Sequence, residues 1–424
     1  MKGPVMSTPH TFTFAILGVG SRGQTFSHWV WEHPQAGRVV AIAEPIEDRR
    51  RKIAEQHAIP PQRQFTSWEQ LLDQPRLADV IIDALMDRLH APSAIRALDK
   101  GYHMLLEKPM ATTLAECVAI DEARRRNNRI VSVCHSLRYH AVYAEVKRML
   151  KSGAIGRLMS FDQVEGVDPV HQSHSFVRGN WGNEQRTCFI LMTKSCHDID
   201  ILAYLADARC VRVSSFGALS HFRKENAPPG ATARCTDGCP AEAQCPYSAI
   251  KIYVSPALGW YDEAAGFADW PRERRMEALR SDRYGVCVYQ ADNDVLDHQV
   301  VAFEFEGGIT GTFTMTAFAP PGRHLRLHGT EGQLRADIDE NAIELVRFSD
   351  RAVTKIEFPR QSGTHGGGDS NVMEGLLNAL RANDPDAVLT TTAQSLATHR
   401  IVFAAERSRR EGRVVEISEL MRQA

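Results

Sequence analysis

The stretch "HMLLEKPM" places Glu107, Lys108 and Pro109 directly after a short apolar run. If that run is a strand of a parallel sheet, its last side chains enter the crevice where α/β proteins bind ligands. A lysine there can bond a substrate hydroxyl, stabilise a developing alkoxide, and transfer a proton if burial lowers its pKa. The alternative is a surface lysine paired with Glu107, and the stretch alone leaves both open.

A histidine supplies a second candidate group. The stretch "FILMTKSCHDIDILAYL" predicts a helix in which Lys194, His197 and Ile201 share one face by i, i+3, i+7 spacing. His197 can move a proton near neutral pH, although a lone histidine is more often a satisfied core residue. Lys194 could bind an anionic substrate group, or it could pair with Asp198 four residues later.

The stretch "AILGVGSRGQ" carries G-x-G-x-x-G as Gly18, Gly20 and Gly23. Between a strand and a helix, such glycines permit a tight turn, close approach of a pyrophosphate and close helix packing. Glu44 follows Gly23 by 21 residues, near the spacing of the carboxylate that bonds the ribose diol. A carboxylate there repels a 2′-phosphate, so NAD is favoured over NADP, while Arg22 and the arginines at 49–51 leave NADP open.

The type of secondary structure that the sequence predicts changes along the chain. From 12 to about 134, apolar runs such as "RVVAIAE" and "DVIIDAL" alternate with helical stretches, as in a parallel sheet covered by helices. Strands rich in Val, Thr and Phe follow, with glycine turns typical of a mostly antiparallel sheet, and then helices near 369–382 and 391–410. We therefore predict an α/β protein, with a Rossmann dinucleotide-binding domain at 11–136 and an α+β domain at 137–424.

Three cysteines cluster in "RCTDGCPAEAQCPYSA", at Cys235, Cys239 and Cys245. Clustered thiols in a chain without a secretory signal indicate a metal more than a disulfide, and zinc takes four sulfur or nitrogen ligands. His221 is the expected fourth ligand. The spacing is not a standard zinc pattern, so a structural zinc site and free thiols are both open.

These motifs together resemble the Gfo/Idh/MocA family, which includes glucose–fructose oxidoreductase and inositol dehydrogenase. The matching stretches are the glycine loop, "DRLHAPSAIRALDKGYHMLLEKPMATT", "HSLRYHAVYAEVKRMLKSGAIG", "SCHDIDILAYL" and "HGTEGQL", which span nearly the whole chain. The resemblance implies a Rossmann domain, a substrate-binding domain with an open, predominantly antiparallel sheet, and NAD(P)-dependent redox chemistry on sugars or polyols. It also implies a homodimer or homotetramer formed through that sheet.

The resemblance makes Lys108 and His197 the catalytic pair. The expected cofactor contacts are Gly18, Gly20, Ser21, Arg22, Gly23, Glu44, His90, Glu107, Lys108 and Pro109. The expected substrate contacts are Arg138, Tyr139, His174, Arg178, Trp181, Lys194 and His197. One position departs from the family pattern, because Thr193 stands where many family dehydrogenases have an aspartate. Lys194 beside it could replace the lost acid function.

The leading hypothesis is an NAD-dependent oxidoreductase of a sugar hydroxyl. The alternative is an NAD-dependent glycoside hydrolase that works by transient oxidation, elimination and re-reduction, and a third class is a non-catalytic NAD-binding regulator. A formal charge of −2 without a long basic block gives no case for nucleic acid as partner. No run of 18 apolar residues predicts a membrane span, and the nine cysteines form no evident disulfide framework, so we expect a cytoplasmic protein.

Overall fold

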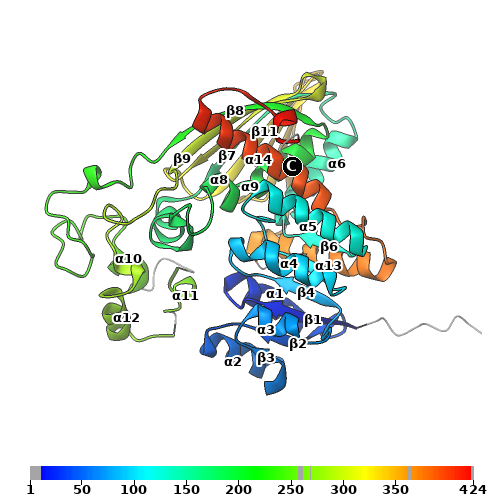
Figure 1. The fold of residues 1–424 in the computed structure, drawn as a ribbon. Helices are drawn as coiled ribbons and strands as arrows, with labels where there is room; N and C mark the ends of the chain where they lie inside the picture. Colours follow the sequence, from blue (N-terminus) through cyan, green and yellow to red (C-terminus); the bar gives the residue numbers. More distant parts are fainter. Residues whose placement is uncertain (1–10, 256–260, 268, 361–363, 422–424) are drawn as a thin grey trace, which may run out of the picture. The chain divides into compact units, whose positions relative to one another are not determined.

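A computed structural model describes residues 11–255, 261–267, 269–360 and 364–421. The chain divides into two compact units (Figure 1). The first unit contains the described residues up to 141 together with those within 360–399. The second contains the described residues within 142–359 and 400–423.

The first unit is built on sheet A, whose six strands are all parallel and follow the order β3-β2-β1-β4-β5-β6. The strands are β1 (Phe12–Leu17), β2 (Gly37–Ala43), β3 (Gln64–Phe65), β4 (Val80–Asp83), β5 (His103–Leu106) and β6 (Val131–Val133). All four residues of β4 are buried. Such continuous burial is what a parallel sheet covered on both faces requires, and it explains the apolar runs of the sequence.

Six helices accompany sheet A in the first unit. They are α1 (Ser21–Glu32), α2 (Glu47–Gln56), α3 (Trp68–Asp73), α4 (His90–Asp99), α5 (Leu114–Asn127) and α13 (Gly368–Ala382). A capping box of Thr113 and Glu116 starts α5, with both reciprocal hydrogen bonds present. After α4, Gly101 adopts a φ of 82°, the left-handed conformation that glycine takes at little cost.

Helix α13 lies far from the others in sequence but belongs to the same core. Val372 and Leu376 of α13 join Phe14 of β1 and Phe26 of α1 in one buried apolar cluster. We expected a single domain boundary near 137. The division at 141 is close to that position, but the chain returns to the first unit at 360–399.

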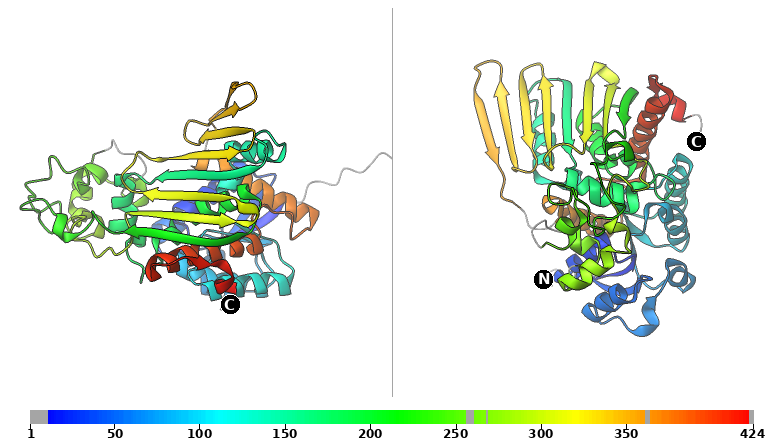
Figure 2. Two further views of the ribbon diagram at one scale, coloured as in Figure 1. Left: turned by 90° about the horizontal axis from the view of Figure 1, so that it is seen from above. Right: turned by 90° about the vertical axis from the view of Figure 1, so that its left-hand side faces the viewer.

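The second unit is built on sheet B, whose nine strands follow the order β14-β13-β12-β11-β7-β10-β9-β8-β15. The strands are β7 (Leu158–Gly166), β8 (Cys210–Ala218), β9 (His298–Phe305), β10 (Thr310–Thr316), β11 (Gly322–Gly329), β12 (Gly332–Asp337), β13 (Ala342–Arg347), β14 (Val353–Glu357) and β15 (Val415–Glu416). Neighbours are antiparallel except β7 and β10. Figure 2 shows these strands side by side in one open layer.

The remaining α-helices in the described residues are α6 (Ala141–Lys151), α7 (Pro169–His171), α8 (Ile190–Thr193), α9 (Cys196–Ala206), α10 (Ala249–Tyr253), α11 (Tyr261–Ala264), α12 (Arg272–Leu279), α14 (Thr392–Glu411) and α15 (Ile417–Met421). Of these, α9 carries a predicted site residue, His197. Helix α14 begins among first-unit residues and ends among second-unit residues. A long segment leaves sheet B at the end of β8 and returns at the start of β9; it holds α10, α11 and α12.

The fold class predicted from the sequence is confirmed, because sheet A is parallel and sheet B is largely antiparallel and open. The sequence pattern did not predict β3, β14 and β15, which have two to five residues and lie at sheet edges. Few of their side chains are buried, so their sequences lack a clear apolar run. Within the described residues, no helix has the length and apolar character needed to cross a membrane.

Candidate active site

The glycine loop has the form that a dinucleotide requires. Gly18 adopts a φ of 80°, and a Cβ on it would lie 2.7 Å from the carbonyl oxygen of Ala84. A Cβ on Gly23 would lie 2.0 Å from the carbonyl oxygen of Gly18, so this glycine lets α1 pack closely. At Gly20, by contrast, a Cβ would meet no described atom within 4 Å. The loop therefore leaves open space at Gly20, where a pyrophosphate is expected to approach the backbone.

The N-terminus of α1 is also suited to bind the phosphates of a dinucleotide. Gly20 is its N-cap and makes no side-chain capping bond to the N–H groups of that end. The N–H groups of the first turn, beginning with Ser21, can therefore bond phosphate oxygens. Glu44 follows β2 directly; its carboxylate accepts hydrogen bonds from the N–H groups of Val19, at 2.7 Å, and Ile46, at 3.0 Å. The residues present fit NAD at this loop.

Arg22 connects the glycine loop to two carboxylates. Its Nε bonds Glu107 Oε1 at 2.6 Å, and its two terminal nitrogens bond the carboxylate of Asp369 at 2.8 Å each. Ser136 also donates to Asp369, at 2.5 Å. Although burial opposes the charge, Glu107 and Asp369 hold the pKa of Arg22 well above its usual value. The guanidinium is thus bound to carboxylates of its own chain, which weakens the case for a 2′-phosphate partner.

Asp369 lies in the first turn of α13 but does not cap this helix. The N-cap of α13 is Gly367, which has a left-handed backbone, and the Asp369 side chain turns to Arg22 and Ser136 instead.

The turn after β5 is fixed from both sides. Glu107 Oε2 accepts the backbone N–H of Lys108 at 3.0 Å while Oε1 holds Arg22, so one carboxylate sets the backbone from which the lysine side chain leaves. The Lys108–Pro109 peptide bond is cis. His90 lies beneath the turn, with its ring nitrogens 2.8 Å from the oxygen of Pro109 and 3.1 Å from that of Leu85. His90 thus supports the turn in the described contacts, and its contact with a cofactor stays a prediction.

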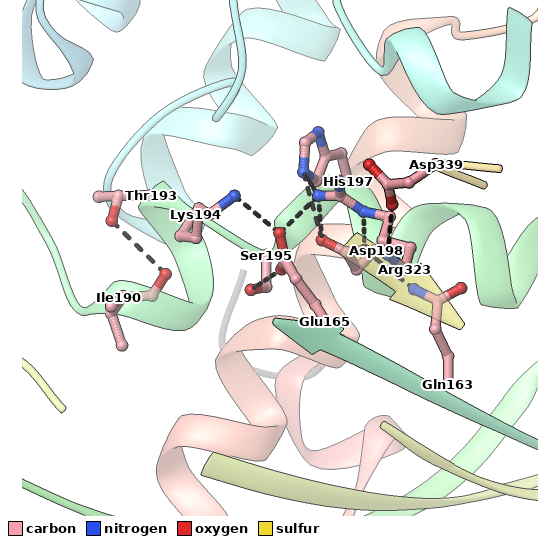
Figure 3. A network of polar contacts seen from close by, with 10 residues as sticks. All are labelled: Gln163, Glu165, Ile190, Thr193, Lys194, Ser195, His197, Asp198, Arg323 and Asp339. Carbon is pink, nitrogen blue, oxygen red and sulfur yellow. Dashed lines mark hydrogen bonds and ion pairs between the residues drawn. The ribbon is translucent and has the colours of Figure 1, made fainter. Parts of the chain in front are cut away.

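His197 lies in a buried polar network of the second unit, which is centred on Arg323 (Figure 3). The Nη2 of Arg323 is 2.6 Å from Glu165 Oε1, 2.8 Å from His197 Nε2 and 3.2 Å from Asp198 Oδ2. Its Nε bonds Asp198 Oδ1 at 2.7 Å. One guanidinium nitrogen therefore reaches two carboxylates and the imidazole together.

The network is assembled from three elements. Glu165 of β7 and Arg323 of β11 are directly opposite in the antiparallel register. Gln163, two residues before Glu165 and on the same face of β7, donates to Asp198 Oδ1 at 2.9 Å, which ties the start of α9 to the sheet. Because side chains alternate along a strand, Gln163 and Glu165 reach the same buried layer.

Lys194 enters this network through Glu165. Its Nζ lies 2.7 Å from Glu165 Oε1, and Ser195 donates to Glu165 Oε2 at 2.9 Å. Burial lowers the pKa of Lys194, which Glu165 opposes. The partner of Lys194 is therefore Glu165 and not Asp198, and the predicted single helix is broken at Lys194 and Ser195, between α8 and α9. Two carboxylates face one ammonium and one guanidinium, so the charges around His197 balance.

Glu165, His197 and Asp198 form the only group of three potential metal ligands within 4.8 Å of one another that the described residues contain. Arg323 Nη2 is within hydrogen-bonding distance of all three. Since a guanidinium nitrogen stands where an ion would bind, these residues do not fit a metal in this arrangement.

Two other predicted substrate residues hold parts of the first unit together. Arg138 donates to the carbonyl oxygen of Leu389 at 2.8 Å. The hydroxyl of Tyr139 accepts the N–H of Leu389 at 3.1 Å, and burial raises the pKa of Tyr139. Both residues therefore fix the segment between α13 and α14.

The predicted substrate loop around His174 is helical. Residues Gln172–Arg178 form a π-helix, η4, in which His174 stacks on Tyr284 and its Nδ1 lies 2.8 Å from the hydroxyl of Tyr253. Arg178 donates to the carbonyl oxygens of Val286, at 2.6 Å, and Tyr247, at 2.7 Å. Trp181 is half-buried beside Phe176. These contacts give His174 and Arg178 structural partners, and substrate contact by the three residues stays a prediction.

Comparison with protein families identifies two matching domain models. Residues 12–135 match the Gfo/Idh/MocA model described as an oxidoreductase family with an NAD-binding Rossmann fold. Residues 147–417 match the C-terminal alpha/beta domain of the same family. Together these models cover most of the chain.

Among curated proteins, YteT of Bacillus subtilis (strain 168) is 26% identical over 75% of this chain and 77% of its own length. The scyllo-inositol 2-dehydrogenase (NAD(+)) of the same organism is 25% identical over 50% of this chain. That match spans only 58% of the dehydrogenase.

Among solved structures, a levoglucosan dehydrogenase in complex with NADH and levoglucosan is similar to this chain with a TM-score of 0.71. It is 18% identical, and the alignment covers 96% of this chain and all of that one. An oxidoreductase from Agrobacterium radiobacter, in complex with NAD+, L-tartaric acid and magnesium, has a TM-score of 0.70 at 15% identity over 97% of this chain and 100% of its own. At this identity the likeness establishes the fold.

The two glycines of the loop give a matched pair of variants. Gly20→Ala adds a Cβ into open space at an ordinary φ of −68°, so its thermal stability should match wild type while NADH affinity falls at least about 10-fold. Gly23→Ala forces a Cβ against Gly18, so it should lose about 1–3 kcal/mol of unfolding free energy. NADH fluorescence titration and thermal melts measure both. Equal NADH affinity in Gly20→Ala and wild type would contradict the assigned cradle.

His174 predicts a pH dependence of stability. Burial, with help from Arg178, lowers its pKa from 6.5 to about 3. In the folded state His174 stays neutral while the unfolded chain takes a proton, so its contribution is present above pH 6.5 and is lost as pH falls toward 3. His174→Gln should flatten urea-unfolding stability across this window, with His103, whose pKa burial lowers to about 4, keeping part of the slope. Identical pH profiles in the two proteins would refute this assignment.

Proposed function

Since this chain belongs to the Gfo/Idh/MocA family of NAD-dependent oxidoreductases, we propose that it transfers hydride between NAD and a hydroxyl-bearing carbon of a sugar or polyol. The observation that carries the proposal is His197, buried in a charge-balanced network in a family with a Rossmann cofactor cradle. Curated relatives named inositol dehydrogenases and a structural neighbour named levoglucosan dehydrogenase support a carbohydrate substrate.

The contacts of His197 suggest which atom moves the proton. When Arg323 donates to Nε2 at 2.8 Å, that nitrogen carries a lone pair, which is the form of a general base. Nε2 also lies 3.2 Å from Asp198 Oδ2. An imidazole that gains a proton on Nε2 loses the Arg323 bond and gains a carboxylate partner. We propose that this exchange accompanies removal of the hydroxyl proton during oxidation.

Lys108 is the second proposed catalytic residue. Glu107 accepts the backbone N–H of Lys108 and also bonds Arg22 of the glycine loop. This carboxylate therefore links the backbone of the lysine to the loop that is expected to bind the cofactor. We propose that the ammonium of Lys108 bonds the reacting oxygen and stabilises the alkoxide. NAD, when bound, supplies the hydride acceptor. The assignment of Lys108 and His197 to one reaction rests on the family resemblance.

Lys194 has a supporting place in this proposal. Because its ammonium is paired with Glu165, it balances the network around His197, and binding an anionic sugar would require it to leave that carboxylate. We therefore favour a neutral polyol or sugar over an anionic one. A homo-oligomer formed through sheet B is part of the same proposal.

A substrate panel tests the proposal. The protein is supplied with NAD and with inositols, free sugars, uronates or aryl glycosides, and NADH and released aglycone are both recorded. Net NADH supports the oxidoreductase; aglycone without net NADH supports the hydrolase alternative; NAD binding without turnover across the panel contradicts both.

Lys108→Met should lower kcat about 10²–10⁴-fold, as expected for a residue that stabilises a transition-state charge. Lys100→Met is the matched control, because Lys100 is a first-unit lysine whose Nζ bonds the carbonyl oxygen of Gln74 at the surface. Thermal melts and NADH titration establish that both variants fold and bind cofactor. Full turnover in Lys108→Met would refute the proposed role.

A further inference from the structure

Four cysteines of the second unit line one cavity. Cys235, Cys239 and Cys245 of the predicted cluster are joined by Cys287, which the sequence analysis did not consider. His221, the expected fourth ligand, is not among the lining residues of the cavity; its Nε2 lies 3.2 Å from the hydroxyl of Tyr289. In the described residues Cys287, and not His221, therefore lines the cavity with the three predicted cysteines.

A backbone N–H group beside the cavity donates to one of the sulfur atoms. The N–H of Ala249 donates to Cys235 Sγ at 3.4 Å. N–H groups directed at sulfur stabilise thiolates and tune the metal centres that they bind.

Arg178 brings a positive charge next to the sulfur of Cys235. Arg178 places Nη2 3.7 Å from Cys235 Sγ, and the same nitrogen bonds the carbonyl oxygen of Tyr247. Thiolates are stabilised beside arginine. A buried guanidinium beside Cys235 offsets part of the negative charge that four thiolates would bring together.

The spacing of the sulfurs discriminates between metal centres. A tetrahedral zinc with Zn–S bonds of about 2.3 Å holds its four sulfurs about 3.8 Å apart. In the described residues no three cysteine sulfurs are mutually within 4.8 Å, because the only such group of ligand atoms is Glu165, His197 and Asp198. The described cysteines therefore do not form the compact sulfur set of the single zinc ion that the sequence suggested.

We propose that Cys235, Cys239, Cys245 and Cys287 are the four thiolate ligands of an iron–sulfur cluster. Such clusters take four cysteine ligands that are shared among several irons, which sets the sulfurs farther apart than around one ion. All four cysteines are free thiols in the structure.

The cluster has a structural role in this proposal. In the described part of the segment between β8 and β9 the helices are short. The stretches that carry Cys235 and Cys287 are already linked, because the N–H of Cys235 donates to the oxygen of Gly285 and the N–H of Cys287 to that of Ala233. A centre bound to all four sulfurs fixes these stretches to the 239–245 turn. It also fixes the surroundings of Arg178, and so the end of η4.

The test is metal analysis of the full chain, produced with iron and sulfide supply and purified without oxygen. The expected result is iron and acid-labile sulfide in equal amounts, with broad visible absorption near 400 nm. Stoichiometric zinc without iron, or no bound metal, would overturn the proposal. Since this readout uses the wild-type chain and no substrate, its failure leaves the proposed oxidoreductase function untouched.

Variants separate the fourth ligand from its alternatives. Cys287→Ser should lose most of the iron, at least about fivefold, whereas Cys210→Ser, at the start of β8 and outside the cavity, should keep it. His221→Gln should also keep it. If Cys287→Ser does not fold, the wild-type sulfide content and its electron paramagnetic resonance spectrum still decide the question. Full iron content in a folded Cys287→Ser protein would overturn the ligand set.

Discussion

The second unit depends on one buried guanidinium, that of Arg323. Burial removes the water that would solvate its charge. The ion pairs with Glu165 across the strand pair and with Asp198 on α9 offset this cost. Although burial works against the charge, Asp198 and Glu165 raise the pKa of Arg323, so the group stays a cation at any working pH. Removing one partner of such a buried pair generally costs about 3–5 kcal/mol, because the charge left behind has no compensation. The same guanidinium also holds His197, whose Nε2 lies 2.8 Å from Nη2 of Arg323.

Arg22 has the corresponding position in the first unit. It too binds two carboxylates, Glu107 and Asp369, and it too lies beside the residue proposed to do chemistry. In both units the catalytic candidate is held indirectly: Glu107 fixes the backbone of Lys108, and Asp198 with Arg323 fixes the ring of His197. Arg22 is more exposed, with 26% of its side chain accessible against 15% for Arg323. Its pairing is therefore screened more by water, and the second-unit network is the more sensitive of the two to loss of a partner.

The sequence was most informative where chemistry is local. The glycine loop, Glu44, the capping box at Thr113 and the end of β5 all depend on residues near one another, and the structure has them as the pattern predicts. The networks were not predictable in the same way. Arg323 pairs with Glu165 from 158 residues away and Arg22 with Asp369 from 347, and only tertiary structure brings these together. One signal was available: in "FDQVEG" the period of two puts Glu165 in phase with buried Phe161, and a buried carboxylate needs a cation. For Cys287 no local spacing marked its relation to the other three cysteines.

The central claim is that Arg323 holds His197 with an unprotonated Nε2, ready to accept a proton. Nitrogen-15 NMR of the protein labelled at histidine tests this directly, with the His197→Gln spectrum identifying the resonances. At neutral pH the account predicts the neutral tautomer with hydrogen on Nδ1, and it predicts that Arg323→Met removes this preference while labelled His324, an exposed histidine on β11, keeps its signals. A His197 that carries its proton on Nε2 in the wild-type protein would contradict the account.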